Sequence, residues 1–215
     1  MSTISASKIN TYHSCPRKYY LQYILNLKEP IESPWLEFGS RVHSKLSNNI
    51  FDSEDPQEQI MLKNGKKFLD SMPKNPIRET SYEDSNNPGR FFGDVLGHRA
   101  VGIFDLHWTP DTSMAADYKT GQFWKSYTSH FDMQAWMLNE LFKQKYDQPL
   151  KRFCFAFLKD GTIYEPECIT DEKASKKTER AINKILNGIE SEKFTKKCGN
   201  LCASCGLNML CPLDL

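Results

Sequence analysis

The sequence predicts an α/β or α+β domain in which helices flank a sheet. The reason is that apolar residues recur with helical spacing in some segments and with strand-like spacing in others. Helical spacing opens the chain and returns in its last third. Between residues 77 and 119 it gives way to short β-prone runs separated by turn signals such as Asn87-Pro88-Gly89. A chain of 215 residues, 39% of them hydrophobic, is long enough for one sizeable core. We therefore expect a single domain over residues 1–215.

The expected elements follow from these patterns and from end signals such as Ser5 or Ser7, either of which can cap a first helix running through Tyr12. Further helices are expected over residues 17–24, 36–51, 52–72, 129–145 and 171–189. Strands are expected over residues 91–92, 101–108, 114–118, 153–158 and 162–166. The order is helices, sheet, helix, strands and helix, which is typical of a sheet covered by helices.

Charge and hydropathy exclude several classes of protein. The 28 basic and 27 acidic residues give a net charge of +1, so any DNA contact must come from a local basic patch. No apolar run approaches the roughly 18 residues that suggest a membrane span, and residues 1–7 lack the features of a signal peptide. We expect a cytoplasmic protein with no membrane association.

Two aspartates and a lysine form the pattern that carries chemistry. Asp105 ends the run that begins at Gly102, and Asp117 and Lys119 share a strand two residues apart, hence on one face. Strands joined by the intervening turn would bring Asp105 and Asp117 together, and paired carboxylates favour Mg²⁺ or Mn²⁺. A metal with a lysine that positions or helps deprotonate water is what phosphodiester hydrolysis requires. The alternative is that these aspartates are solvated turn residues, and an Asp-x-Lys triplet alone carries little weight.

The cysteines form a second candidate site. Seven is an odd number in a chain of this length, which favours metal ligation over a disulfide framework. Cys198, Cys202, Cys205 and Cys211 lie near the C-terminus and Cys15 near the N-terminus. The Cys202-x2-Cys205 pair suits zinc or an iron-sulfur cluster, and the four C-terminal thiols could bind zinc without Cys15. Cys154 and Cys168 lie in apolar runs and are expected to be buried.

A set of motifs in chain order covers nearly the whole sequence. It consists of residues 5–9, residues 15–20, residues 38–43, residues 102–105, residues 117–121, Gln134 and the terminal cysteines. These motifs resemble the PD-(D/E)XK nuclease superfamily, specifically its RecB-like branch. That branch includes nuclease domains of bacterial recombination helicase-nucleases and CRISPR-associated exonucleases. The resemblance implies a restriction-endonuclease-like core with a central mixed sheet flanked by helices.

Roles for single residues also follow from the resemblance. It implies that His43, Asp105 and Asp117 ligate Mg²⁺ or Mn²⁺ together with the backbone carbonyl of Tyr118. It further implies that Lys119 is the catalytic lysine and that Gln134 orients it or the DNA backbone. One departure is Leu138, which stands where many relatives carry a tyrosine.

The resemblance implies a [4Fe-4S] cluster held by Cys15, Cys202, Cys205 and Cys211. Residues 1–30 and 191–215 would then be joined at this cluster as a subdomain, with Cys198 a spare or alternate ligand. Zinc remains the alternative, because four thiolates satisfy either centre.

The function expected from the motifs is a metal-dependent DNA exonuclease acting at single-stranded ends, in CRISPR spacer acquisition or in recombination and repair. CRISPR integrase or helicase proteins are the expected partners. The alternative is a non-catalytic DNA-binding or partner module of a larger recombination complex. Four aromatic side chains could stack on single-stranded bases, and the alternative is that they pack in the core; they are Tyr19, Tyr20, Tyr23 and Trp124.

Overall fold

The computed structural model describes residues 3–29, 34–79, 86–108 and 111–211. Its main sheet has the strand order β1-β4-β5-β6-β7, in which β5 and β6 run parallel and the other neighbours antiparallel. The strands are β1 (Ile77–Arg78), β4 (Leu106–His107), β5 (Met114–Lys119), β6 (Arg152–Phe157) and β7 (Thr162–Tyr164). This central mixed sheet agrees with the predicted fold class.

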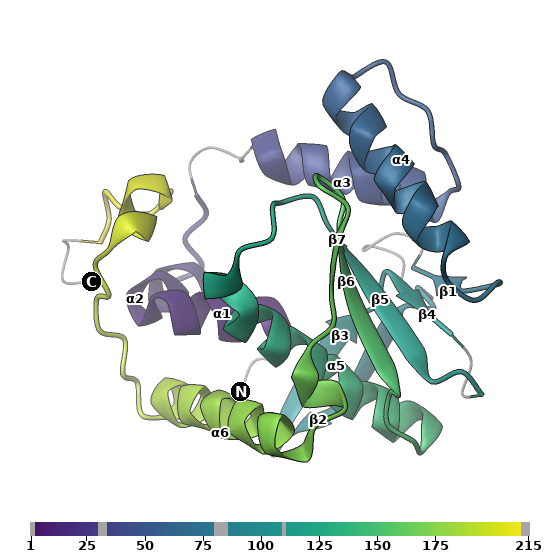
Figure 1. Ribbon diagram of the computed structural model, residues 1–215. Coiled ribbons are helices and arrows are strands. Elements are labelled where there is room, and N and C mark those ends of the chain that lie inside the picture. Colours follow the sequence, from purple (N-terminus) through teal and green to yellow (C-terminus); the bar gives the residue numbers. More distant parts are fainter. Residues whose placement is uncertain (1–2, 30–33, 80–85, 109–110, 212–215) are drawn as a thin grey trace.

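Helices cover both faces of the sheet (Figure 1). They are α1 (Ala6–Ser14), α2 (Pro16–Tyr19), α3 (Pro34–Ser47), α4 (Pro56–Asp70), α5 (Thr128–Tyr146) and α6 (Glu172–Glu190). Short turns are the π-helical η1 (Tyr20–Ile24) and the 3₁₀ segments η2 (Lys125–Tyr127), η3 (Glu167–Ile169) and η4 (Asn200–Ser204). Each expected helix is present with shifted ends. The one expected over residues 36–51, for example, ends at Ser47, two residues before Asn49 turns the chain with a φ of 57°.

Two hydrophobic cores lie on the two faces of the sheet. Ala115 of β5 and Phe155 of β6 belong to the core shared with α1, α5 and α6. Ala116 and Tyr118 belong to the core shared with α3 and α4. Because side chains alternate along a strand, Asp117 shares the face of Ala115 and therefore lies on the α5 side.

A two-stranded antiparallel hairpin, β2 (Arg90–Val95) and β3 (His98–Ile103), forms a separate sheet against α5. The single strand predicted over residues 101–108 was therefore wrong, because β3 ends at Ile103 and β4 begins at Leu106. The chain leaves the hairpin at Phe104, whose N–H donates to Gly89 O, and joins the main sheet. Asp105 occupies the bend between the two sheets.

The terminal segments pack on each other. The hydroxyl of Tyr12 donates to the carbonyl of Lys193 at 2.6 Å, and Lys197 Nζ donates to the carbonyl of His13 at 3.0 Å. The ring of Tyr19 stacks on Phe194 with centroids 6.1 Å apart. No helix among the described residues is long and apolar enough to cross a membrane.

Candidate active site

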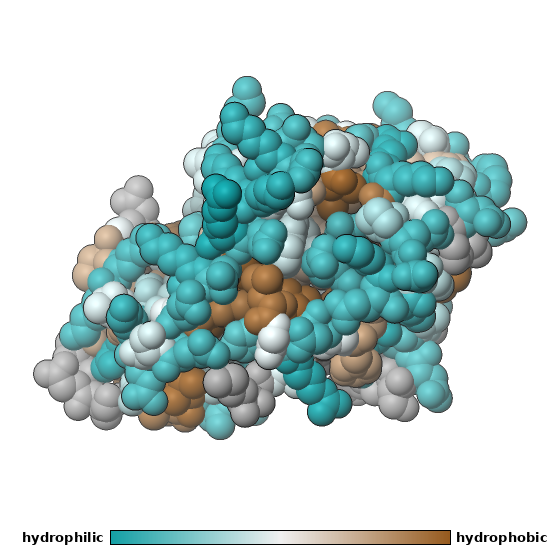
Figure 2. All heavy atoms as spheres, turned by 90° about the horizontal axis from the view of Figure 1, so that it is seen from below, coloured by the Kyte–Doolittle hydropathy of each residue, from teal (hydrophilic) through white to brown (hydrophobic). Residues whose placement is uncertain are grey.

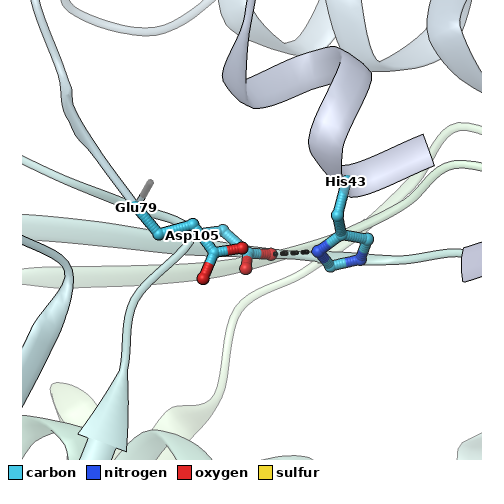
Figure 3. A group of neighbouring side chains, drawn as sticks. All are labelled: His43, Glu79 and Asp105. Atoms are coloured by element: carbon cyan, nitrogen blue, oxygen red, sulfur yellow. Dashed lines mark ion pairs between the residues drawn. The ribbon is translucent and has the colours of Figure 1, made fainter. Parts of the chain in front are cut away.

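His43, Glu79 and Asp105 bring three potential metal ligands together at one end of the sheet (Figure 3). One ligand atom from each lies within 4.8 Å of the others, and His43 Nδ1 is 3.3 Å from Asp105 Oδ2. His43 comes from α3, Glu79 follows β1, and Asp105 lies in the bend before β4. An imidazole with two carboxylates is a donor set that suits a divalent cation.

Backbone hydrogen bonds hold this group in place. The pairing of β1 with β4 continues where Glu79 N–H donates to Asp105 O at 3.1 Å. The N–H of Tyr118 donates to Asp105 Oδ2 at 2.6 Å. At this bend the side-chain carboxylate of Asp105 therefore accepts a hydrogen bond of the kind that a backbone carbonyl accepts within the sheet. The ring of Tyr118 also contacts that of His43, edge to face, with centroids 5.9 Å apart.

Asp117, Lys119 and Gln134 form a second group beside Asp105. Lys119 Nζ lies 2.7 Å from Asp117 Oδ2 and donates to Gln134 Oε1 at 3.0 Å. Gln134 Nε2 donates to Asp117 Oδ1 at 2.8 Å, closing a three-residue network. Asp117 is not among the three residues whose ligand atoms all lie within 4.8 Å of one another, but its charge is close enough to raise the pKa of both His43 and Glu79.

The site concentrates ionisable groups in a largely buried position. Burial raises the pKa of Glu79 to about 8, and the neighbouring charge of Asp105 acts in the same direction. Burial lowers the pKa of His43, but the charges of Asp105 and Asp117 more than offset this and raise it to about 9. Burial also raises the pKa of Asp117, against the opposing effect of Lys119. Carboxylates that are costly to ionise next to one another are stabilised by a bound cation.

Glu79 was not among the site residues predicted from the sequence. The strand that precedes it, β1, is only two residues long and pairs with residues 106–107, far along the chain. Local periodicity contains no signal for such a pairing. An acidic residue directly after a short apolar-basic stretch is too common to single out.

Four of the predicted residues line one cavity with Glu79, namely Asp105, Asp117, Lys119 and Gln134. The cavity has a volume of about 1580 Å³ and reaches the C-terminal cysteines. Its basic lining residues are Lys8, Lys18, Arg90, Lys119, Lys196 and Lys197, and its acidic ones are Glu79, Asp105 and Asp117. Every charged lining residue outside the cluster of carboxylates is therefore basic, so this cavity has a local excess of basic side chains that the near-neutral net charge of the chain does not reveal.

The five cysteines of the second candidate site also line this cavity. They are Cys15, Cys198, Cys202, Cys205 and Cys211, and none forms a disulfide. Burial raises the pKa of the Cys211 thiol, with further contributions from the nearby Cys15 and Cys198. The other two cysteines, Cys154 and Cys168, are 0% and 3% exposed, as predicted.

The aromatic residues divide between the two predicted roles. Tyr19 is 2% exposed and packs in the core, whereas Trp124 is 55% exposed. Tyr20 and Tyr23 contact Phe194 and Tyr19 respectively, so both take part in aromatic packing.

A buried divalent-metal donor set beside a lysine, at the edge of a mixed sheet, is an arrangement that metal-dependent phosphodiester hydrolases use. The family model of the PD-(D/E)XK nuclease superfamily matches residues 3–212, and the chain belongs to this superfamily. Membership implies a nuclease with DNA as its substrate class and a divalent metal as cofactor. The mixed sheet flanked by helices is consistent with the restriction-endonuclease-like fold. A search of curated proteins gave no match.

Proposed function

We propose that this protein is a metal-dependent DNA exonuclease of the RecB-like branch that hydrolyses single-stranded DNA ends. The observation that carries the proposal is the network of Lys119, Gln134 and Asp117 directly beside the donor group at Asp105. A module that only bound DNA would have no chemical need for a lysine held between a carboxylate and an amide at a cation site.

The proposed ligands of Mg²⁺ or Mn²⁺ are His43, Asp105, Asp117 and the backbone carbonyl of Tyr118, with Glu79 as a further carboxylate ligand. The donor types fit a hard divalent cation. In an extended strand the N–H and C=O of one residue point to the same side. The carbonyl of Tyr118 therefore faces Asp105, as its N–H does. When bound, the cation polarises the scissile phosphate and lowers the pKa of water.

Lys119 has the role of positioning the attacking water and taking part in its deprotonation. Its ammonium is held by Asp117 and by Gln134 Oε1, so the side chain is fixed rather than mobile. Gln134 acts as a positioning residue, because its amide bonds both Lys119 and Asp117. A fixed orientation removes the entropy cost of arranging these groups at each turnover.

The preference for ends and the biological setting rest on the motif resemblance. Relatives that combine these motifs with terminal cysteines act on DNA ends in recombination and repair or in CRISPR spacer acquisition. We therefore propose helicase or integrase proteins as partners and the cytoplasm as the place of action.

The decisive test is a Mn²⁺-dependent assay on single-stranded DNA labelled at one end. We expect progressive shortening from the end by the wild-type protein and none by Asp117→Asn. DNA binding by the wild-type protein without any cleavage under these conditions would instead support the alternative, a non-catalytic DNA-binding module.

We also propose a [4Fe-4S] cluster at Cys15, Cys202, Cys205 and Cys211. The donor set fits, since four thiolates from the two packed terminal segments line one cavity. Four cysteines also satisfy a zinc ion, so the identity of the metal is what the experiment has to distinguish. When bound, the cluster would join residues 1–30 and 191–215 into one subdomain and stabilise it.

Anaerobic purification followed by a visible spectrum and by iron and sulfide analysis tests the cluster. We expect a brown protein whose iron is lost in Cys202→Ser and retained in Cys154→Ser, a buried cysteine outside the cavity. A colourless protein with stoichiometric zinc would contradict the cluster and leave the nuclease proposal untouched.

A further inference from the structure

The cavity has one wall formed by the outer face of the β2–β3 hairpin. Phe92 and Val101 are directly opposite each other in the register, as are Arg90 and Ile103, and all four line the cavity. Phe91, on the other face of β2, is 2% exposed, whereas Phe92 is 60% exposed. The hairpin therefore presents a large unburied aromatic ring, flanked by aliphatic side chains and one guanidinium, to the cavity.

Another wall of the cavity is polar and is formed by residues of α1 and α2. Ser7, Thr11, Ser14 and Lys18 follow one another at spacings of four, three and four residues and all line the cavity. Ser7, Thr11 and Ser14 therefore lie on one face of α1, and Lys18 lies on α2, beyond the break at Cys15. Thr11 Oγ1 already donates to Ser7 O, and Ser14 Oγ bonds His130 Nε2. The group of this polar stripe best able to bind phosphate oxygens is therefore the ammonium of Lys18, which is 31% exposed and pairs with Glu29 at 2.7 Å.

A backbone bridge holds the two walls together. Ile4 N–H donates to Arg99 O at 2.9 Å, and Val101 N–H donates to Ile4 O at 3.0 Å. The start of α1, two residues later, is thereby fixed beside β3. The same cavity contains Asp105, Asp117 and Lys119. A ligand extended along both walls would thus reach the candidate active site.

We propose that this cavity is a track for one strand of DNA, with Phe92 as a base-stacking residue and the polar stripe as the contact for the phosphates. The inference rests on the proposed nuclease function and names the residues that select its substrate. An apolar wall facing a polar basic one matches a strand whose unpaired bases are exposed on one side and whose phosphates lie on the other. A duplex stacks its bases inside and presents anionic phosphates outward, so it would leave Phe92 without a partner.

Figure 2 shows one face of the molecule, on which hydrophobic residues are exposed in the middle and surrounded by hydrophilic ones. Phe92, at 60% exposure, is one of the large hydrophobic side chains that the protein leaves exposed.

Binding of a fluorescently labelled oligo-dT, measured by anisotropy with Ca²⁺ in place of Mg²⁺, tests the track. We expect Phe92→Ala to raise the Kd about tenfold or more, the effect typical of losing one stacking platform, and Phe92→Tyr to stay near the wild-type value. The matched control is Trp35→Ala, because Trp35 is 74% exposed yet does not line the cavity. The Kd of the Trp35→Ala variant for oligo-dT should equal that of the wild-type protein.

A second variant, Lys18→Gln, removes the ammonium group of the polar stripe. We expect a rise of a few-fold in Kd for oligo-dT, because one charged contact to a phosphate is lost. A blunt duplex should compete poorly with oligo-dT for the wild-type protein.

The outcomes separate this inference from the proposed function. If the wild-type protein degrades DNA but Phe92→Ala binds oligo-dT as tightly as wild type, the track is wrong and the nuclease proposal stands. Equal competition by a blunt duplex would also overturn it. If the wild-type protein neither binds nor cuts DNA, the nuclease proposal itself fails.

Discussion

The Nζ atom of Lys119 lies 2.7 Å from Oδ2 of Asp117, two residues earlier on the same strand. The pair is enclosed in the fold, since the side chains of Lys119 and Asp117 are only 27% and 8% exposed. Gln134 bonds both partners from α5. The lysine therefore compensates a buried carboxylate and is held where it can act on a substrate.

Replacing Lys119 by Met should lower the cleavage rate at least about 100-fold, because the group that we propose positions the attacking water is lost. Stability should also fall, since Asp117 would be left buried without its cation. Rates are therefore compared per folded molecule, with folding checked by circular dichroism. Lys159→Met, at an exposed position outside the cavity, is the control and should cut at the wild-type rate.

Glu79→Gln should weaken binding of the divalent metal by about tenfold or more, because a carboxylate ligand becomes a neutral amide of the same shape. The readout is the Mn²⁺ concentration needed to raise the Tm of the protein by half of its maximal shift. Glu54→Gln, on the exposed loop before α4, should titrate like wild type. An unchanged Mn²⁺ titration for Glu79→Gln would remove Glu79 from the ligand set.

Gly102→Ala should reduce the free energy of unfolding by about 1–3 kcal/mol, the usual cost of overpacking. A Cβ at Gly102 would overlap Leu138 Cδ2 and lie 2.8 Å from Leu141 Cδ1, and both leucines are buried. Urea unfolding measures the loss. Gly121→Ala is the control, since a Cβ there meets nothing within 4 Å, and equal stability losses in the two variants would contradict the packing argument.

The pair His13 and His130 should make stability depend on pH. Burial lowers the pKa of His130 to about 4, and the neighbouring His13 and Lys197 act in the same direction. Because the folded-state pKa is below the unfolded value near 6.5, the unfolded chain binds more protons as the pH falls. The contribution of His130 to the free energy of unfolding is therefore fully present above pH 6.5 and is lost as the pH decreases toward 4.

Urea unfolding at pH 7.5 and pH 5 measures this effect. The decrease in the free energy of unfolding from pH 7.5 to pH 5 should be smaller for His130→Gln than for the wild-type protein. Ser14 Oγ lies 2.9 Å from His130 Nε2, and glutamine can keep a hydrogen bond there. Parallel losses in both proteins would show that other groups account for the acid sensitivity.

The sequence by itself determined the order of the elements and which face of a strand or helix each residue occupies. The alternation in Met114–Lys119 places Asp117 and Lys119 on one face, and Ser5, one of the two predicted caps, caps the first helix. Such features depend on residues only a few positions apart, so the local sequence pattern predicts them.

Only the tertiary structure decided how distant segments meet. The strand expected over residues 101–108 is divided at Asp105 between two sheets, and Glu79 lies beside His43. The tertiary structure also placed Phe92 and the C-terminal cysteines around one cavity with the catalytic candidates. These contacts depend on loop closure and on packing between elements far apart in the chain, and no local periodicity specifies either.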